Sequence, residues 1–365
     1  MKLSIFHHNR NKKGFLFTII AAWAGGILFR AVGLPLPWLL GPMAAGIFLS
    51  RFPKAGACWP VQLRDAGLII VGYSLGLSFT KEAVIGIGWH LPAMFASAVL
   101  LILLCAGMAF ITSRVTGLDY PTVLLGSIPG GLSQIVALAE EIKGINISVV
   151  AFLQVSRLIM IVSLIPLLIY SPFFGGHRGA PLEGVPFERS SVLLLLLFSA
   201  ACIAGALLAK KWKLPTPFLL GPMAAAAILV LLGTDGVSLP GSVMNLSQFM
   251  IGGYVGLLVK PGLIQKKVQF SVLSLLNGLF LIGGSFLISL ALSRFYSFSP
   301  VTSYLSTAPG GMDQMGIIAH EVKADLTVVT AFQLFRIFFI YFVVPPLLKS
   351  LFARLGKKEA AESRS

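Results

Sequence analysis

Charged residues are scarce in this sequence, and their scarcity excludes a water-soluble domain. They make up 11% of the 365 residues, whereas soluble domains carry about a quarter. The mean hydropathy is +0.90. Apolar runs at 192–209, 270–292 and 328–348 are close to the roughly 20 residues that cross a bilayer as a helix. The composition therefore predicts an all-α polytopic membrane protein in contact with membrane lipid.

Cysteine pairs and the common enzyme motifs are missing as well. Cys58, Cys105 and Cys202 stand singly in or beside apolar segments, so we interpret them as packing residues rather than as a metal or redox site. The sequence has no Walker loop, no nucleotide-binding glycine fingerprint and no nucleophile elbow. We therefore expect no enzymatic activity, no catalytic or metal-binding residues and no resident cofactor.

Acidic residues are outnumbered, with 13 against 28 basic residues and a net charge of +15. In a soluble protein this excess would suggest nucleic acid, but membrane proteins gather Lys and Arg in their cytoplasmic loops. We therefore expect no nucleic-acid partner. The basic stretch 1–13 precedes an apolar stretch at 14–32 that has no clear processing site, so we expect a retained first span rather than a signal peptide.

The chain contains two copies of one unit. Four motifs recur in the same order: residues 34–45 as 214–225, residues 127–134 as 307–314, Gln154 with Arg157 as Gln333 with Arg336, and Gly72-Tyr73 as Gly253-Tyr254. In the first of these pairs, ten of the twelve residues are identical. Ordered matches of this kind indicate a duplication.

The duplication divides the chain into two membrane repeats. We place the first repeat at 14–170 and the second at 191–351, with a linker rich in Pro and Gly at 171–190. The remaining residues, 1–13 and 352–365, are predicted to be cytoplasmic tails.

The orientation of the two repeats depends on the fifth apolar segment of each, which carries Pro-Gly-Gly. If this segment enters and leaves on one side, each repeat has about five spans, the repeats are inverted, and most of the 28 basic residues fall in the cytoplasm. One alternative has twelve crossings and parallel repeats. In another, the fifth segment consists of two half-helices that meet near the midplane and leaves the membrane on a different side. We favour two inverted repeats with a broken or re-entrant Pro-Gly-Gly helix, about 10 to 12 membrane segments in all.

The paired breaks are the strongest functional signal. They are Pro129, Gly130 and Gly131 in the first repeat and Pro309, Gly310 and Gly311 in the second. Pro removes a backbone donor and Gly weakens a helix, and irregular backbone at membrane depth is tolerated only beside protein or a water-filled cavity. Paired broken helices are typical of secondary transporters. The alternative is a kinked helix at a packing contact.

Polar residues follow each break. They are Ser133 and Gln134 in the first repeat, and Asp313 and Gln314 in the second. Ser133 and Asp313 can serve as helix caps. Alternatively Asp313, a carboxylate on an intramembrane segment, is a candidate ligand for a coupling ion, either Na+ or H+.

A Gln-x-x-Arg motif lies further along each repeat. Gln154 with Arg157 and Gln333 with Arg336 are each three residues apart, so each pair shares one helix face. An arginine inside an apolar helix points into the bundle. One hypothesis is a site for an anionic substrate group, and the other is a structural pair with the carbonyls or carboxylates that the broken helix frees.

Small residues in the motif at 34–45 and its copy, Gly41 and Gly221 among them, are interpreted mainly as positions of close helix packing. His320 and Glu321, about two turns after the second break, are either solvated charge at a segment end or, for His320, a proton relay.

The paired Leu-Leu-Gly-Pro-Met and Pro-Gly-Gly motifs, each followed by Gln-x-x-Arg, resemble the membrane AbrB family over about 14–351. This family is distinct from the soluble DNA-binding regulators of the same name. The resemblance implies a membrane protein with a duplicated domain, and members carry names such as ammonia monooxygenase or regulator of gene expression. Family members often have an acidic residue at the places of Gln134 and Gln314, which are amides in this sequence.

The monooxygenase name does not fit the residues. Oxygen chemistry needs copper or iron ligands, and the five histidines are not grouped. We therefore predict a secondary transporter of a small solute in the bacterial inner membrane, with a membrane-bound regulator of gene expression that acts indirectly as the alternative. The predicted tails are too short for an effector domain. Whether the protein forms a homodimer stays open.

Overall fold

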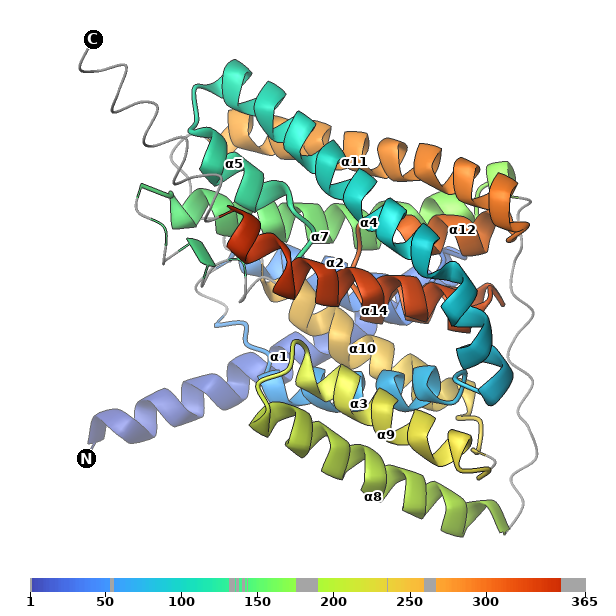
Figure 1. The fold of residues 1–365 in the computed structure, drawn as a ribbon. Coiled ribbons are helices and arrows are strands. Elements are labelled where there is room, and N and C mark those ends of the chain that lie inside the picture. Colours follow the sequence, from blue (N-terminus) through green and yellow to red (C-terminus); the bar gives the residue numbers. More distant parts are fainter. Residues whose placement is uncertain are drawn as a thin grey trace.

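The computed structural model describes residues 2–52, 56–130, 144–174, 190–234, 236–258 and 267–348, together with Ile135, Leu138, Ala139 and Ile142. All regular elements in these ranges are helices (Figure 1). Those of the first half are α1 (Lys2–Ala31), α2 (Pro37–Ser50), α3 (Val61–Gly76), α4 (Lys81–Thr116), α5 (Tyr120–Ser127), α7 (Ile147–Ile169) and the 3-10 turn η2 (Pro172–Phe174). Those of the second half are α8 (Ser190–Lys211), α9 (Pro217–Leu231), α10 (Gly241–Leu257), α11 (Lys267–Tyr296), α12 (Pro300–Thr307), α13 (Met312–Glu321) and α14 (Leu326–Phe342).

Five of these helices are long and apolar enough to cross a membrane. They are the apolar parts of α1, α4, α7, α8 and α11, and the shorter α2, α9 and α14 are also apolar. The prediction of an all-helical fold with apolar helices long enough to span a membrane is thereby confirmed for the described residues. Helix α1 begins at Lys2, whereas its candidate membrane span is Gly14–Ala31. The helix therefore starts before the first span, within the residues predicted to be a tail, whose cytoplasmic location stays a prediction. Residues 175–189 and 349–365 lie outside the described residues, and the predictions for most of the linker and for the C-terminal tail stay predictions.

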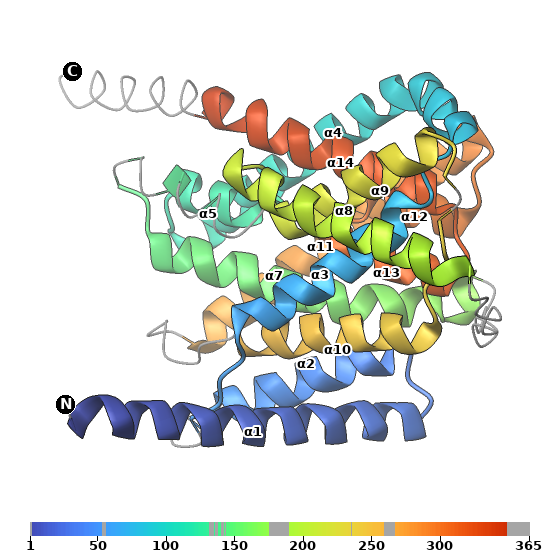
Figure 2. The same cartoon turned by 90° about the horizontal axis from the view of Figure 1, so that it is seen from below.

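The helices form two bundles, and each bundle takes helices from both halves of the chain (Figures 1 and 2). Helices α1, α2, α3, α8, α9 and α10 form the first, which we call the glycine-packed bundle. Helices α4, α5, α7, α11, α12, α13 and α14 form the second, the broken-helix bundle. The packing is symmetric in sequence: α1 packs on α2 as α8 packs on α9, and α5 packs on α7 as α12 packs on α14.

Close backbone contacts at glycine hold the glycine-packed bundle together. A Cβ atom on Gly41 of α2 would lie 2.5 Å from the carbonyl carbon and oxygen of Gly25 in α1, and one on Gly221 of α9 would lie 2.3 Å from the carbonyl oxygen of Gly205 in α8. No side chain fits at these distances, so only glycine allows the two helices to approach. The prediction that the motif at 34–45 and its copy serve close packing is confirmed.

The same contacts correct the register of one sequence match. Gly72 of α3 lies against the carbonyl oxygen of Leu219, and Gly252 of α10 lies against that of Leu39. Gly252 is therefore the structural counterpart of Gly72, and the match of Gly72-Tyr73 with Gly253-Tyr254 is wrong by one residue. Gly253 instead faces the ring of Trp59.

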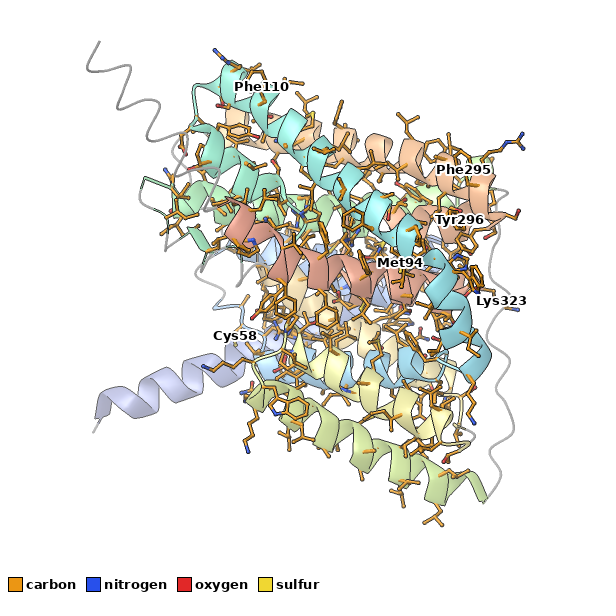
Figure 3. The ribbon with its side chains drawn as sticks, viewed as in Figure 1. Cys58, Met94, Phe110, Phe295, Tyr296 and Lys323 are labelled. Carbon is orange, nitrogen blue, oxygen red and sulfur yellow. The ribbon has the colours of Figure 1, made fainter. Side chains whose placement is uncertain are left out.

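Corresponding helices of the two halves run in opposite directions. In Figure 1, α4 runs from right to left and α11 from left to right, and α7 and α14 are opposed in the same way. The molecule therefore has two ends. Figure 3 shows Cys58 and Phe110 toward one end, and Phe295, Tyr296 and Lys323 at the other. We call these the Lys213 end, after the residue in the short α8–α9 connection, and the Lys323 end.

Basic residues at the helix ends are distributed unequally between the two ends of the molecule. Those at the Lys213 end are Arg51, Arg64, Arg114, Lys210, Lys211, Lys213 and Lys267, and those at the Lys323 end are Arg30, Lys81, Arg294 and Lys323. Exposed aromatic side chains also occur at both ends, with Trp212 69% exposed and Phe295 81% exposed. Such aromatic side chains are typical of membrane interfaces.

Candidate functional site

Both predicted helix breaks are present as far as the chain is described. In the second half α12 ends at Thr307 and α13 begins at Met312, so the backbone of 308–311 is not helical. In the first half α5 ends at Ser127, and the described residues up to Gly130 are also outside a helix. Gly131, Ser133 and Gln134 lie outside the described residues.

Each broken segment returns to the end at which it began. The backbone N–H of Asp325, which precedes α14, donates to Thr302 Oγ1 near the start of α12 at 3.1 Å. The backbone N–H of Asn146, which precedes α7, donates to Thr122 Oγ1 near the start of α5 at 3.0 Å. The hydrogen bonds tie the entry and the exit of each segment together. Capping residues set these entries, because Asp119 and Ser299 accept from the first turns of α5 and α12.

Gln154 and Arg157 of α7 bind the backbone carbonyls that end α5. Gln154 Nε2 donates to the carbonyls of Leu125 and Ile128, both at 2.8 Å. Arg157 Nη1 donates to the carbonyls of Ser127 and Ile128 at 3.2 and 2.7 Å. Arg157 Nη2 donates to Gln154 Oε1 at 2.8 Å, which fixes the guanidinium plane. The last carbonyls of a helix lack hydrogen-bond donors within the helix, and Gln154 and Arg157 supply these donors.

Gln333 and Arg336 of α14 repeat this arrangement at the end of α12. Gln333 Nε2 donates to the carbonyls of Leu305 and Ala308, and Arg336 Nη1 donates to Ala308 as well. Arg336 Nη2 donates to the carbonyl of Gly310 at 2.6 Å and also to Gln333 Oε1. The contact of the Gln-x-x-Arg motif with freed carbonyls is therefore present in both halves. A substrate role for the four residues stays a prediction.

The buried guanidinium groups are favourably placed for helix electrostatics. Each lies at the C-terminal end of a half-helix, where the backbone carries partial negative charge. Arg157 and Arg336 are nevertheless close enough for their charges to act on each other. Arg157 is 7% exposed and Arg336 is 5% exposed, and the Nε of each has no hydrogen-bond partner among the described residues. The two guanidinium groups are held in place, but the Nε–H of each remains available as a hydrogen-bond donor.

Asp313 and Gln314 lie in the first turn of α13. Asp313 Oδ2 accepts from Gln314 Nε2 at 2.8 Å, and the carboxylate faces the backbone amides at the start of the helix and the charge of Arg64. Asp313 is partly exposed, whereas Gln314 is buried and its Oε1 has no partner among the described residues. The prediction that Asp313 caps the helix is wrong, because the N-cap position of α13 is Gly311 and no side chain caps it. Asp313 lies within the first turn, where its charge complements the positive end of the helix, and its role as an ion ligand stays a prediction.

A cavity of about 480 Å³ lies between the two bundles and joins these features. The predicted residues that line it are Pro129, Gly130, Arg157, Pro309, Gly310, Gly311, Asp313, Gln314 and Arg336. The breaks of both halves therefore meet at one site. Gln154 and Gln333 are not among the lining residues, because they stand behind the arginines and hold the carbonyls.

Sequence reasoning missed several residues of this cavity. The polar ones are Arg64 of α3, Lys213 and Thr216 before α9, Tyr254 of α10 and Tyr341 of α14. Arg64 is paired with Asp65 at 2.6 Å, and its guanidinium carbon lies 4.6 Å from the centre of the Tyr254 ring. In the sequence, Lys213 and Arg64 belong only to the excess of basic residues that indicates topology. The packing of α3, α9 and α10 against the breaks brings them to the cavity.

The cavity reaches the surface at the Lys213 end. Lys213 and Thr216 both line it and are both exposed. Their backbones are unusual, because Lys213 has φ 55° and Thr216 has φ 42°, a left-handed conformation that is costly for residues other than glycine. The first-half counterpart of Thr216 is Leu36, which has φ 48° and is only 4% exposed. Leu36 is packed in the core, while Thr216 borders an opening.

A second polar group lies at the far end of α13. Gln248 of α10 is buried, and its Nε2 donates to Glu321 Oε1 at 3.0 Å. His320 is partly exposed, and its Nδ1 has no hydrogen-bond partner among the described residues. Glu321 is thus a hydrogen-bonded residue rather than free solvated charge. The relay hypothesis for His320 stays a prediction.

Comparison with known proteins identifies the family. A family model described as "Transition state regulatory protein AbrB" matches residues 2–125 and 38–352. The chain belongs to the AbrB family. This AbrB-family chain is similar to "Uncharacterized protein YhjN" of Bacillus subtilis (strain 168), with 26% identity covering 96% of each chain. It is also similar to "Putative regulator AbrB" of Escherichia coli (strain K12), with 27% identity covering 91% of this chain and 94% of the relative.

Proposed function

We propose that this AbrB-family protein is a secondary transporter that moves a small solute across the bacterial inner membrane. The observation that carries the proposal is that the Pro-Gly breaks of both halves line one cavity between two bundles. Irregular backbone at membrane depth is stable beside such a cavity, and secondary transporters bind their substrates at the meeting point of broken helices from two repeats.

We propose further that the two halves are inverted repeats. In this topology α1, α2, α3, α4 and α7 cross in the first half, α8, α9, α10, α11 and α14 cross in the second, and the broken segments are re-entrant from opposite sides. The opposite course of α4 and α11 supports it. So do the hydrogen bonds of Thr122 and Thr302, which close each broken segment on the side where it entered.

The Lys213 end then faces the cytoplasm. Basic residues gather at that end, and cytoplasmic loops carry the excess of Lys and Arg. The cavity reaches the surface there beside Lys213 and Thr216, so this conformation is open to the cytoplasm. In the opposite conformation, in which each half adopts the present arrangement of the other, Thr216 would be buried and the cavity would open beside Leu36. The rocking of one bundle against the other around a fixed site is the expected transport step.

Asp313 is proposed as the residue that couples transport to an ion. It is the one carboxylate among the described residues that line the cavity, and an intramembrane carboxylate beside a cavity binds a proton or a cation. Its first-half counterpart is Ser133, so each cycle would move the charge of a single carboxylate.

The test is flux through purified protein in liposomes. Small acids, amines and ammonium are screened under imposed proton and sodium gradients, and Asp313→Asn is compared with the unmodified chain. We expect flux that an ion gradient drives and that Asp313→Asn uncouples. Absence of flux for every solute would contradict transport and favour the regulator alternative, whereas unchanged coupling in Asp313→Asn would remove Asp313 from the mechanism.

The proposed topology has its own test. Single cysteines replace Trp212 and Ser297, which are exposed at opposite ends of the molecule, in a background where Cys58, Cys105 and Cys202 are alanine. In intact cells an impermeant thiol reagent should label the cysteine at 297 and not the one at 212. Equal labelling of both would contradict the inverted arrangement.

A further inference from the structure

We infer that the solute is a small organic anion whose charged group binds between Lys213, Arg64 and the start of α13. The inference rests on the proposed transport function and names the substrate class of the same cavity. It follows from the charges, the unpaired polar atoms and the walls of the cavity, considered in turn below.

The charge of the cavity is predominantly positive. Arg64, Arg157, Lys213 and Arg336 line it, against Asp313 as the one carboxylate among the described lining residues. Arg157 and Arg336 are committed to backbone carbonyls, but carbonyls do not neutralise their formal charges. Removing charge from water is costly unless an opposite charge is near. A bound anion would supply that opposite charge.

Unpaired polar atoms at the break point to a ligand. The Nε–H donors of Arg157 and Arg336 lack hydrogen-bond partners among the described residues, although both side chains are more than nine-tenths buried. Gln314 Oε1 also lacks a partner there, but it is an acceptor and suits a proton donor or a cation rather than the anion. Buried polar atoms are nearly always satisfied. All three residues line the cavity. The positive end of α13 lies beside them, and the Asp313 carboxylate already faces the backbone N–H groups of Asp313 and Gln314 there.

Lys213 and Arg64 are the cations best placed to select the substrate. Lys213 is exposed, and the structure assigns it no part in holding the broken helices. Its backbone is left-handed, with φ 55°, at a position where the first half has Gly33 with φ 73°. A lysine in a backbone conformation that suits glycine is strained, and strain of this kind is common at functional sites. Arg64 stands over Tyr254, and its Nε and Nη2 donate to Asp65 Oδ1. These contacts fix the direction of its guanidinium group, so among the described residues Lys213 is the principal unpaired cation of the two.

The walls decide between an inorganic and an organic anion. Away from the charged groups the cavity is lined by apolar and aromatic side chains, including Leu158, Ile161, Phe218, Val255 and Ile340. Its volume of about 480 Å³ lies in the range of small-molecule sites. Apolar walls do not replace the hydration shell of a small inorganic ion, but they bury the body of a carboxylic acid.

Asp313 is compatible with an anion only when its own charge is neutralised. It lies in the same cavity, and like charges at close range oppose each other. A proton or a sodium ion on Asp313 would remove the repulsion. Binding of the anion and of the coupling ion should therefore assist each other, which is the thermodynamic basis of symport.

The experiment measures thermal stabilisation of the purified protein by matched probes. Benzoate is compared with benzamide and benzylamine, and hexanoate with hexanamide and hexylamine, so that only the charged group changes. We expect an acid to raise Tm, more strongly at low pH or with sodium, and the amide and amine not to do so. Lys213→Gln should weaken the apparent affinity about tenfold or more, the effect of losing a charge-assisted hydrogen bond.

The controls separate this inference from the transport function. Lys213→Arg should retain binding, and Lys211→Gln, an exposed residue outside the cavity, should leave it unchanged. Stabilisation by the amine or amide as large as that by the acid, or no stabilisation by either acid, would overturn the anion site. Liposome flux of an amine would support transport but contradict the anion site. Binding of an acid without flux of any solute would support the anion site but contradict transport.

Discussion

Gly41 and Gly221 occupy equivalent places in the two halves of the chain, and each meets a glycine of the neighbouring helix at a distance that admits no side chain. Five residues before them, Leu36 and Thr216 also share a left-handed backbone, but Leu36 is buried and Thr216 is exposed at the cavity. The halves therefore agree where backbone packs on backbone. They agree also in the breaks and the arginines that line the cavity, and they differ in the residues around its opening, such as Thr216.

This difference has a physical reason. Backbone contacts between helices depend on small residues at fixed positions, so both copies of a duplicated unit must keep them. Cavity residues depend on what is bound and on which side is open. Arg157 and Arg336 are shared by the two copies, but Arg64 corresponds to Met244 and Lys213 to Gly33. The cavity charges that hold no broken helix therefore come from positions where the copies have diverged. The duplicated residues form the helix packing and the two breaks, and the diverged residues add Arg64, Lys213 and Thr216 to one side of the cavity.

The largest effect is expected from removing either arginine that binds a break. Arg336→Met leaves the carbonyls of Ala308 and Gly310 and the Oε1 of Gln333 without this donor. Hydrogen bonds to charged groups contribute about 1.5–3 kcal/mol each, so the loss should be about 3 kcal/mol or more. Arg157→Met should cost a similar amount, because its contacts are equivalent. Thermal unfolding of both variants in detergent measures this loss. If only one of the two variants lowered Tm, the two arginines would not have equivalent roles.

The glycine contacts should also cost the same in both halves. Gly41→Ala and Gly221→Ala each force a Cβ atom onto the backbone of a neighbouring helix, and overpacking of this kind costs about 1–3 kcal/mol. Gly107→Ala is the matched control, because a Cβ atom there meets nothing within 4 Å. We expect lower Tm values for the first two variants and an unchanged or higher Tm for the control. A marked difference between Gly41→Ala and Gly221→Ala would contradict the symmetric packing.

The divergent position of Thr216 offers a way to make the halves more alike. Thr216→Leu installs the residue of the first half at the same backbone conformation and should narrow the opening beside Lys213. In an Asp313→Cys background, the rate of modification by a small thiol reagent should fall several-fold, while Thr216→Ser should leave it unchanged. Equal rates in both variants would mean that the cavity reaches Asp313 by another route.

The smallest effects are expected at the left-handed connections. Gly117 in the first half corresponds to Ser297 in the second, with φ 71° and φ 54°. Ser297→Gly should therefore stabilise the protein by about 1 kcal/mol, and Gly117→Ala should destabilise it by about as much. Ser293→Gly, inside α11, should destabilise the protein because glycine is unfavourable within a helix. Unfolding temperatures of the three variants decide whether the left-handed backbone is strained.

Much of the frame could be predicted from the sequence. The breaks at Pro129 and Pro309 were predictable because proline and glycine act locally on the backbone. The contact of Arg157 and Arg336 with freed carbonyls was one of two stated hypotheses, because a buried arginine needs acceptors and a broken helix provides them. The glycines of the motif at 34–45 were predictable because small residues in apolar helices indicate packing.

The rest of the site depends on contacts between distant helices. Arg64 and Lys213 reach the cavity only because α3 and α9 pack against the broken-helix bundle, and each looks like a topology signal in the sequence. The match of Gly72 with Gly253 went wrong by one residue because two neighbouring glycines make the register ambiguous. The return of each broken segment to its starting end depends on the hydrogen bonds of Thr122 and Thr302, which no local pattern predicts.

The cavity at the Lys213 end also has an electrical consequence. In the proposed topology, an aqueous cavity that reaches the breaks would bring the potential of the cytoplasm to Asp313. The membrane voltage would then fall across the remaining packed layer around α13 and Leu36 rather than across the full bilayer. One elementary charge carried through that layer gains about 2.3 kcal/mol per 100 mV. An ion on Asp313 would therefore experience most of the voltage within a movement much shorter than the thickness of the membrane.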